Sequence, residues 1–261
     1  MRPPSPGQCR SRAHCAADDL NAVMRAHDTP AAEHGLTTPR TTGRAGTHVE
    51  FDQALNTTRN TMSDKPLIIL AHPKMVGSRL NRALINAIER AGVAEIHDIY
   101  AAYPDGIIDA KAERSRVDMH EKIIFQFPLH WYSCPPFLST WLVDVYVRGW
   151  AYGPGGRALN FKTFGVAVTT GSSGDDYTHE GRYRHTLDEV LTPFELLARH
   201  AGMHYLPAFS VTTARGITDE QLVEIADRYV EHVTSAAPVF EFDGSDDSRA
   251  KTIYPEHYYK V

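Results

Sequence analysis

The chain has no long hydrophobic run and no excess of basic charge. No window of its 261 residues approaches the roughly 18 consecutive apolar residues that a membrane-spanning helix needs, and the N-terminus lacks the apolar core of a secretory signal. A net charge of −5 gives no broad basic field, which argues against nucleic acid as a partner. We therefore expect a cytoplasmic protein that does not bind nucleic acid.

Cysteine is also scarce. The three cysteines, Cys9, Cys15 and Cys134, form an odd set with no C-x-x-C spacing. A disulfide framework needs paired cysteines, and a structural zinc site needs closely spaced ligands. The sequence therefore indicates neither a disulfide framework nor a metal site.

Hydrophobic residues are unevenly distributed, which predicts a tail, a domain and a second tail. Residues 1–60 contain only eight of Leu, Ile, Val, Met, Phe, Tyr and Trp, whereas all 12 tyrosines and all three tryptophans lie beyond residue 99. Such a segment cannot bury enough apolar surface to offset chain entropy, so we predict a disordered extension over residues 1–62. The alternatives are that translation starts at Met62, or that the extension has a targeting role. We expect the folded domain over 65–236 and a C-terminal arm over 237–261.

From Leu67 onward, short apolar runs alternate with longer amphipathic ones, which is typical of a parallel sheet. Strands are expected near 66–71, 94–99, 122–127, 163–169 and 204–211. Helices are expected near 78–91, 110–119, 136–147, 186–201 and 218–234. This alternation predicts one doubly wound α/β domain with helices on both faces of the sheet.

The segment 122–136 contains a buried strand that breaks into an aromatic loop. Ile123–Phe127 is apolar and has the length of a buried strand. In open α/β sheets, ligands bind beyond the carboxyl ends of the strands. His130, Trp131 and Tyr132 are therefore expected at a site, where they offer stacking faces and polar tips. The alternative is that the two aromatic rings simply cover the core.

The loop after the first predicted strand is suited to a phosphate group. Residues 72–78 lead directly from the strand into a helix, where unpaired backbone N–H groups meet the positive end of the helix dipole. Ser78 can cap this helix and donate to an anion, although a plain N-cap is the simpler interpretation. The loop contains neither G-x-x-x-x-G-K-[ST] nor G-x-G-x-x-G, which disfavours a nucleoside triphosphate or a standard dinucleotide. A flavin mononucleotide remains as the expected ligand.

A third strand end is rich in small residues. The predicted strand 163–169 runs into Thr169-Thr-Gly-Ser-Ser-Gly174, where the backbone can approach a planar ligand closely. The N–H groups of this loop could bond the oxygens and nitrogens of a flavin ring. Residues 175–185 then carry many groups able to donate protons, although a solvated charged loop is the alternative. The three strand ends together predict a phosphate cradle, an aromatic wall and a small-residue wall.

Four motifs carry a resemblance to a known family. They are Ala71-His-Pro with Ser78 and Asn81, Gln126-Phe-Pro-Leu-His-Trp-Tyr-Ser-Cys-Pro-Pro136, Gly149-Trp-Ala-Tyr-Gly-Pro-Gly-Gly156 and Thr169-Thr-Gly171. Residues 67–233 resemble the flavodoxin-like NAD(P)H:quinone oxidoreductases, especially the short bacterial ancillary subunits of glutathione-gated potassium efflux systems. The resemblance implies a flavodoxin-like doubly wound five-stranded parallel sheet of order 2-1-3-4-5. It also implies a bound flavin, which we expect to be FMN, with FAD as the alternative.

The resemblance further implies which residues hold the cofactor. Contacts to the flavin phosphate and ribityl chain fall on His72, Ser78, Arg79, Leu80 and Asn81. The isoalloxazine ring would be surrounded by Leu129, His130, Trp131, Tyr132, Thr169, Thr170, Gly171 and Ser172.

The family also implies a homodimer with its sites at the interface. Trp150 and Tyr152 would enter the partner's pocket and form a substrate pocket there together with Tyr177. Tyr177 matches a tyrosine that manages charge on the reducing flavin in mammalian members, and Tyr183 stands where those members have a histidine. The expected catalytic residues are therefore Tyr152, Tyr177 and Tyr183.

The departure at Tyr183 raises the question of a substitute base. His179 or His185 would take the role if the loop folds differently from the family pattern.

The implied activity is transfer of two electrons from NAD(P)H through the flavin to a quinone by a ping-pong mechanism. The alternative is a regulatory ancillary subunit of a membrane potassium transporter, in which case the protein lies against the inner face of the membrane. A one-electron carrier is disfavoured, because a carrier needs an exposed flavin edge rather than aromatic residues over the ring.

Overall fold

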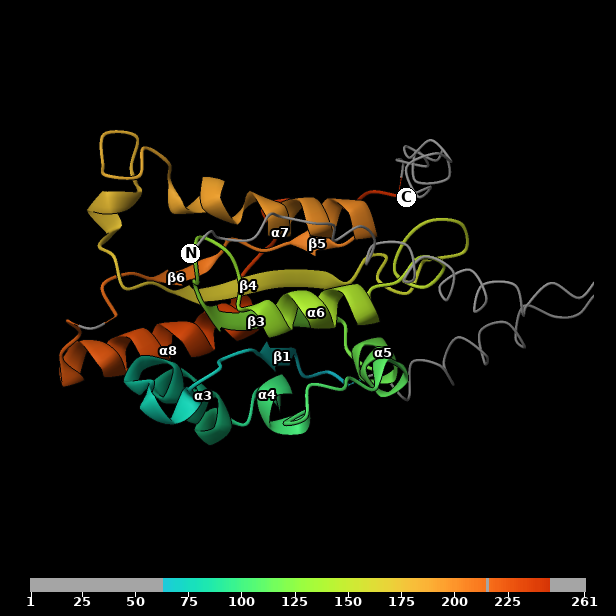
Figure 1. The fold of residues 1–261 in the computed structure, drawn as a ribbon, viewed down its shortest axis with the longest axis horizontal. Coiled ribbons are helices and arrows are strands. Elements are labelled where there is room, and N and C mark those ends of the chain that lie inside the picture. Colours follow the sequence, from blue (N-terminus) through green and yellow to red (C-terminus); the bar gives the residue numbers. More distant parts are fainter. Residues whose placement is uncertain (1–62, 215, 245–261) are drawn as a thin grey trace, which may run out of the picture. The chain divides into compact units, whose positions relative to one another are not determined.

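The computed structural model describes residues 63–214 and 216–244, which form a parallel sheet with helices on both faces (Figure 1). The strands are β1 (Leu67–Leu70), β2 (Glu95–Asp98), β3 (Lys122–Pro128), β4 (Thr163–Thr169), β5 (His204–Tyr205) and β6 (Phe209–Val211). The helices are α3 (Arg79–Ala91), α4 (Ile99–Ala102), α5 (Ala110–Asp118), α6 (Pro136–Val145), α7 (Leu187–Ala201) and α8 (Asp219–Ser235), with 3-10 turns η1 (Met75–Gly77) and η2 (Gly174–Tyr177).

The strand order is β2-β1-β3-β4-β5, with β6 also paired to β4, and every strand pair is parallel. The predicted doubly wound order 2-1-3-4-5 is confirmed. Alternate residues of a strand point to opposite faces, so β1 supplies both halves of the core. Leu67 and Ile69 join the cluster under α5, α6 and α7, whereas Ile68 and Leu70 join the cluster under α3 and α8. Figure 1 shows α3 and α8 together on one side of the sheet.

The helices follow from spacing and capping. In α3, Leu80, Leu84 and Ile88 recur every four residues and form one buried face. Ser78 caps the start of this helix, and Gly92 ends it with a φ of 65°, a left-handed conformation that glycine adopts without strain. Each of the five predicted helices occurs within a few residues of its predicted bounds. The single-turn helix α4 was not predicted.

The prediction of one strand near 204–211 is wrong, because the structure has two strands there. Tyr205 pairs with Phe164, and Phe209 pairs with Ala167, so the β5–β6 side contains one more residue than β4 over this stretch. Pro207 lies in the interruption and has no N–H to donate to a sheet. The extra residue forms a bulge, which the sequence pattern does not reveal.

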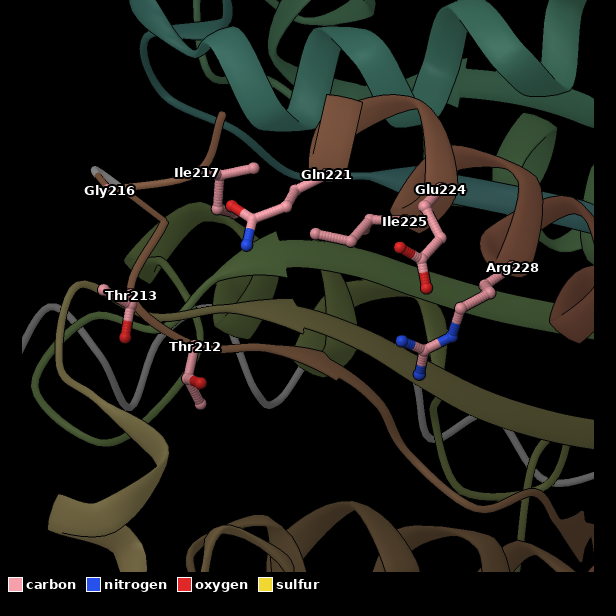
Figure 2. Close-up of a pocket in the computed structure, with 8 residues that line it drawn as sticks. All are labelled: Thr212, Thr213, Gly216, Ile217, Gln221, Glu224, Ile225 and Arg228. Atoms are coloured by element: carbon pink, nitrogen blue, oxygen red, sulfur yellow. The ribbon is translucent and has the colours of Figure 1, made fainter. Parts of the chain in front are cut away.

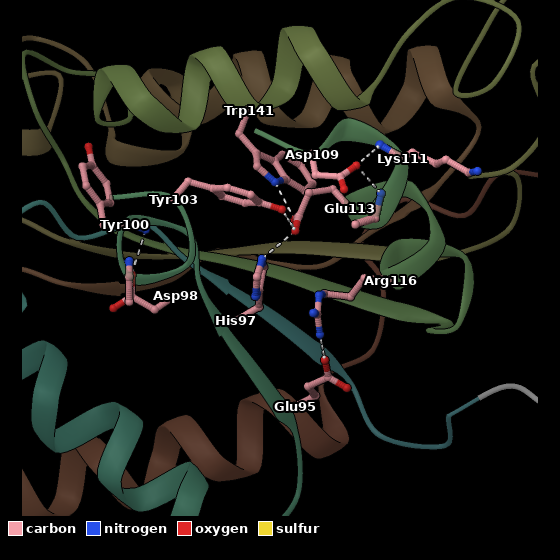
Figure 3. Close-up of polar contacts among 12 residues, drawn as sticks. Glu95, His97, Asp98, Tyr100, Tyr103, Asp109, Lys111, Glu113, Arg116 and Trp141 are labelled. Carbon is pink, nitrogen blue, oxygen red and sulfur yellow. Dashed lines mark hydrogen bonds and ion pairs between the residues drawn. The ribbon is translucent and has the colours of Figure 1, made fainter. Parts of the chain in front are cut away.

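A buried carboxylate that the sequence did not single out ties three elements together (Figure 3). Glu113 of α5 is 1% exposed. Its carboxylate is hydrogen-bonded by the Nε2 of His97 at 2.8 Å, the hydroxyl of Tyr103 at 2.7 Å and the Nε1 of Trp141 at 2.7 Å. Burial alone would raise the pKa of Glu113, but these partners together hold it below the ordinary 4.5. The carboxylate therefore stays ionised and fixes α5 against β2 and α6.

The predicted C-terminal arm begins by returning to the sheet. The N–H of Val239 donates to the carbonyl of Tyr205 at 2.8 Å, and the N–H of Tyr205 donates to the carbonyl of Phe240 at 2.8 Å. The Phe240 ring also lies 3.8 Å from the guanidinium carbon of Arg199. The described part of this arm therefore covers the outer edge of β5.

The rest of the arm, 245–261, and the predicted disordered extension, 1–62, lie outside the described residues. No helix within 63–214 and 216–244 combines the length and the apolar character needed to cross a membrane.

Candidate functional site

The three predicted site loops meet at the carboxyl edge of the sheet, because β1, β3 and β4 are adjacent and parallel. Side chains link these strand ends directly. Asn81 at the start of α3 donates from Nδ2 to the hydroxyl oxygens of Ser78 and Thr169, each at 3.1 Å. The structure therefore brings the predicted phosphate loop and the predicted small-residue loop together.

The link continues into the core through buried amides. The Nε2 of Gln126 donates to the Oδ1 of Asn81 at 3.2 Å, and the hydroxyl of Tyr229 in α8 donates to the Oε1 of Gln126 at 2.9 Å. Asn81, Gln126 and Tyr229 are all almost fully buried. A satisfied buried network of this kind holds its members in one geometry, so the start of α3 is pre-organised.

The start of α3 has the donors that a phosphate requires. The hydroxyl oxygen of Ser78 accepts a hydrogen bond from the backbone N–H of Asn81. The N–H groups of Arg79 and Leu80 have no acceptor within residues 63–214 and 216–244. These two N–H groups and the positive end of the helix dipole can therefore bind an anion.

The side chains of two predicted cofactor residues point elsewhere. The guanidinium of Arg79 forms an ion pair with Asp219 and donates to the carbonyl of Ile217, at the start of α8. Leu80 is buried in the core under α3 and α8. For these two positions only the backbone is available to a ligand.

His72 is the first residue of the phosphate loop. Its Nδ1 accepts a hydrogen bond from the N–H of Lys74 at 3.1 Å, which shapes the loop. Burial lowers the pKa of His72, and the neighbouring charge of His130 lowers it further. A neutral imidazole at this place is a hydrogen-bonding group rather than a cation for the phosphate.

The aromatic loop is a tight turn with an unusual backbone. His130 and Ser133 exchange two backbone hydrogen bonds, at 2.8 and 3.0 Å. Between them, Trp131 and Tyr132 have φ of 50° and 63°, as in a type I′ turn, which normally takes asparagine or glycine. Trp131 is nevertheless 92% exposed and Tyr132 is 49% exposed. Bulky residues in a left-handed conformation mark strain, and strain is often retained where function needs it.

The loop after β4 forms the opposite wall. Thr169 and Thr170 are buried, and the carbonyl of Thr169 accepts from the N–H of Leu129 at 2.9 Å, so this wall is tied to the aromatic loop. A side chain at Gly171 would meet open space. The N–H groups of Gly171 and Ser172 have no acceptor in the described part of the chain, so both remain able to bond a ring oxygen or nitrogen.

Two of the three predicted catalytic tyrosines, Tyr177 and Tyr183, form a cluster with Tyr132 at this edge. Tyr177 is 7% exposed, and its ring centroid lies 4.9 Å from that of Tyr183. Tyr183 also contacts Tyr132 edge to face, with ring centroids 5.3 Å apart. The hydroxyl groups of Tyr183 and Ser172 are 2.8 Å apart. Residues from the aromatic loop and from the loop after β4 therefore share one cluster.

Neither candidate substitute histidine has an interaction with the cluster's hydroxyl groups. The Nε2 of His179 lies 3.0 Å from the carboxylate of Glu189, and both side chains are exposed. The Nδ1 of His185 lies 2.9 Å from the backbone carbonyl of Tyr183. The loop therefore does not bring an imidazole to the position that Tyr183 occupies.

Trp150 and Tyr152 lie away from this edge. They follow α6, which returns to the amino edge of the sheet, and the Tyr152 ring packs 4.8 Å from that of His200 at the end of α7. Gly156 allows this loop to close, since a Cβ there would lie 2.2 Å from the carbonyl oxygen of Tyr152. One chain alone does not combine Trp150 and Tyr152 with Tyr177.

A pocket of about 360 Å³ lies between the start of α8 and the residues that follow β6 (Figure 2). Thr213 in this wall donates from its N–H to the carbonyl of Ser172 at 2.8 Å. On the other side, the carbonyl of Ile217 accepts from Arg79. The pocket therefore adjoins both the loop after β4 and the phosphate loop.

These residues fit a flavin cofactor. The unpaired N–H groups of Arg79 and Leu80 would hold its phosphate, and those of Gly171 and Ser172, beside the open space at the glycine, would hold its ring. The turn at Trp131 supplies aromatic surface beside them.

Comparison with known proteins gives the family. Residues 64–233 match a protein family whose description is 'flavodoxin-like fold', and the chain belongs to this family. The NAD(P)H oxidoreductase YdeQ of Bacillus subtilis, described as uncharacterized, is 38% identical over 171 residues, covering 66% of this chain and 87% of YdeQ. KefG of Enterobacter sp., an ancillary protein of the glutathione-regulated potassium-efflux system, is 37% identical over 174 residues, covering 67% of this chain and 95% of KefG.

Two solved structures agree with this assignment. General stress protein 14 of Treponema denticola, in complex with FMN, is 34% identical with a TM-score of 0.62, and the match covers 65% of this chain and 97% of that one. An NADPH-quinone reductase of P. pentosaceus is 28% identical with a TM-score of 0.61, and the match covers 66% and 99%. The resemblance to flavodoxin-like NAD(P)H:quinone oxidoreductases and to the potassium-efflux ancillary proteins is confirmed.

Proposed function

We propose that the protein is an FMN-dependent NAD(P)H:quinone oxidoreductase. The observation that carries this proposal is the meeting, at one edge of the sheet, of a phosphate-binding helix start, an aromatic turn and a small-residue loop with unpaired N–H groups. The relatives and solved structures support the choice of chemistry, since they include NAD(P)H oxidoreductases, an NADPH-quinone reductase and an FMN complex. The fold alone would not support this choice of chemistry, because one fold hosts many activities.

When bound, FMN would supply the hydride chemistry between NAD(P)H and the quinone, and the site would admit the two substrates to the cofactor in turn. The protein orients the three partners and manages charge. The N–H groups of Gly171 and Ser172, which have no acceptor in the described part of the chain, would stabilise negative charge on the ring. Tyr177 remains a neutral hydrogen-bond donor, because burial, followed by the neighbouring Tyr183, raises the pKa of its hydroxyl.

The substrate pocket is proposed to be completed by a second copy of the chain. Trp150 and Tyr152 lie at the end of the sheet away from Tyr177, beside a largely apolar groove of about 340 Å³ between α6 and α7. A homodimer that places this region over the partner's flavin would provide the aromatic surface that nicotinamide and quinone rings need.

FAD is the alternative cofactor. The pocket beside α8 lies next to the phosphate loop (Figure 2). The adenosine part of FAD would extend into this pocket. Flavin released from purified protein by acid and identified by chromatography distinguishes the two. Release of FMN supports the proposal. Release of FAD alone would mean that FAD, and not FMN, is the cofactor.

The test of activity begins with an absorption spectrum of the full chain reconstituted with FMN. We expect a flavin absorption spectrum that is bleached by NADH or NADPH in stopped flow. We also expect quinone reduction with ping-pong kinetics, which give parallel lines in double-reciprocal plots. The proposal is wrong if FMN-reconstituted protein is colourless and shows no NAD(P)H-dependent quinone reduction.

A second candidate function is that of an ancillary subunit of a membrane potassium-efflux transporter, and the similarity to KefG favours it. In that case the protein would act at the inner face of the membrane. As an oxidoreductase without a transporter partner, it would act in the cytoplasm. Measurement of potassium efflux with wild type and Tyr177→Phe separates the two functions. Stimulation of efflux that survives loss of quinone reduction favours the ancillary role.

A further inference from the structure

Two arginines lie on either side of Tyr183 in the loop that follows η2. Arg182 and Arg184 are both exposed. No carboxylate within residues 63–214 and 216–244 forms an ion pair with either guanidinium. Cations that the protein neither buries nor neutralises remain available to an anionic ligand.

The loop has a fixed shape, which determines where the two arginines lie. The N–H of Tyr183 donates to the carbonyl of Asp176 at 3.0 Å, and the N–H of Arg184 donates to the carbonyl of Gly181 at 3.3 Å. A Cβ at Gly181 would lie 2.1 Å from the carbonyl oxygen of Asp175, so the chain passes closely over η2. Arg184 has a φ of 54°, a left-handed conformation that is strained for arginine. An exposed side chain contributes no core packing that would offset this strain, which points to a functional reason for it.

The arginines adjoin the wall that the loop after β4 forms. The hydroxyl of Tyr183 is 2.8 Å from that of Ser172, whose N–H is one of the two proposed to hold the flavin ring. The guanidinium carbon of Arg182 lies 5.6 Å from the centroid of the Tyr183 ring. The start of α3, which would hold the flavin phosphate, follows β1, and β3 separates β1 from β4 in the sheet. The two cations therefore belong to the ring side of the site and not to the flavin phosphate.

The carboxylates of this loop precede the arginines in the sequence. Asp176 accepts hydrogen bonds from the N–H of Ser173 at 3.0 Å and from its hydroxyl at 3.1 Å. Asp175 and Glu180 are exposed and come before Gly181. Residues 182–187 contain two arginines and no carboxylate, so the part of the loop that follows Gly181 is cationic.

The proposed reaction offers these cations a suitable anion, and the inference rests on that proposed function. NADPH differs from NADH by a phosphate monoester at the 2′ position of its adenosine. When the nicotinamide lies at the flavin ring, the pyrophosphate that both molecules share is nearer the ring, and the 2′-phosphate is at the distal, adenosine end. A phosphate monoester carries about −1.5 to −2 charge at pH 7. Two exposed guanidinium groups match such a group in charge and in hydrogen-bonding geometry.

We propose that Arg182 and Arg184 bind the 2′-phosphate of NADPH, so that the protein uses NADPH in preference to NADH. Arg184 owes its place to the strained turn, and Arg182 owes its place to the ring of Tyr183. Both arginines are binding residues for the co-substrate and take no part in holding FMN.

The first test measures binding, so that it does not depend on turnover. The full chain, with and without FMN, is titrated in a calorimeter with 2′,5′-ADP and with 5′-AMP, two probes that differ only in the 2′-phosphate. Wild type should bind 2′,5′-ADP about tenfold or more tightly than 5′-AMP, and added salt should reduce the difference. Equal binding of the two probes, or binding of neither, would contradict the inference.

The second test compares variants in quinone reduction. Arg184→Gly removes the cation but suits the left-handed backbone, whereas Arg184→Lys keeps a positive charge. Arg184→Gly and Arg182→Ala should each lower kcat/KM for NADPH about tenfold and change kcat/KM for NADH by less than about twofold. Arg184→Lys should keep part of the preference. The control is Arg90→Ala, at an exposed position in the last turn of α3, and it should leave the ratio of the two kcat/KM values unchanged.

Failure of the inference and failure of the proposed function have different signs. Equal kcat/KM for NADH and NADPH in wild type, or an equal loss with both co-substrates in the variants, overturns the inference and leaves the proposed function standing. If wild type reduces no quinone with either co-substrate, the proposed function fails. The comparison of 2′,5′-ADP with 5′-AMP then still decides whether the arginines recognise a 2′-phosphate.

Discussion

Glu113 shows at the scale of one residue how a buried charge is maintained. The carboxylate loses its contact with water but gains three partners, His97, Tyr103 and Trp141 (Figure 3). An ion left in the interior without such partners costs several kcal/mol, so the set works only as a whole. Half of the other residues of α5 are charged, and sequence alone would place Glu113 on a solvated face.

We predict that Glu113→Gln lowers the free energy of unfolding by about 2–4 kcal/mol at pH 7, because an amide cannot accept all three hydrogen bonds. Urea denaturation measures this change. Glu89→Gln, at an exposed position of α3, is the control and should change stability by less than about 0.5 kcal/mol. A similar effect of both substitutions would show that the buried network contributes little.

The same variant has a defined dependence on pH. The folded pKa of Glu113 lies below the ordinary 4.5, so its contribution to stability is complete above pH 4.5. The contribution is lost as the pH falls through the lowered folded pKa, because the carboxylate then binds a proton. The stability difference between wild type and Glu113→Gln should therefore shrink below pH 4.5.

At the scale of an element, the turn between β3 and α6 combines exposure with strain. Trp131 has a positive φ and buries almost none of its surface, so neither backbone preference nor packing explains its presence. A cofactor or partner that packs on the indole would explain it. The sequence predicted the aromatic loop here but not its left-handed backbone, because tryptophan and tyrosine carry no turn signal.

We predict that Trp131→Gly makes the flavin-free protein more stable than Trp131→Ala by about 0.5–1 kcal/mol. Both variants lose the same ring, but only glycine relieves the strain of the positive φ, and part of that gain is offset by its flexibility in the unfolded chain. Thermal unfolding measures the difference, and both variants should bind FMN more weakly than wild type. Equal stability of the two variants would mean that the turn is not strained.

The sequence predicts most helices and strands but not every boundary between them. Apolar runs and helical spacing were sufficient for most of the strands and for the main helices, since these patterns record which face is buried. The strand order came from the family resemblance. The break between β5 and β6 was missed because it depends on register with β4, which is a property of two distant segments. The family resemblance implied Arg79 as a cofactor contact, whereas its side chain is held by Asp219, 140 residues away in the sequence, and no local pattern reveals such a contact.

At the scale of the whole molecule, the proposed site needs two chains. Tyr177 and Tyr152 belong to opposite ends of the sheet, and the interface that would join them stays a prediction. Inactive variants that complement each other can test it directly.

We predict that Tyr177→Phe and Tyr152→Ala are each weakly active alone, and that a refolded equal mixture recovers about a quarter of wild-type quinone reduction. Half of the dimers would be mixed, and each mixed dimer would contain one intact site of two. A mixture of Tyr177→Phe with wild type, refolded and assayed at the same total concentration, is the control for refolding and should retain about half of wild-type activity whether or not subunits exchange. Recovery no greater than the average of the two variants would show that both tyrosines act within one chain.

The hydrogen bonds from Tyr229 through Gln126 to Asn81 have a consequence for anyone who redesigns this protein. Each amide has its oxygen and nitrogen assigned by its neighbours, so neither amide can rotate by half a turn unless the other rotates too. Tyr229→Phe is a substitution in α8, yet it frees the amide that orients Asn81 on the other side of the network. A substitution in the core under α8 therefore also changes the residue that links the start of α3 to the loop after β4.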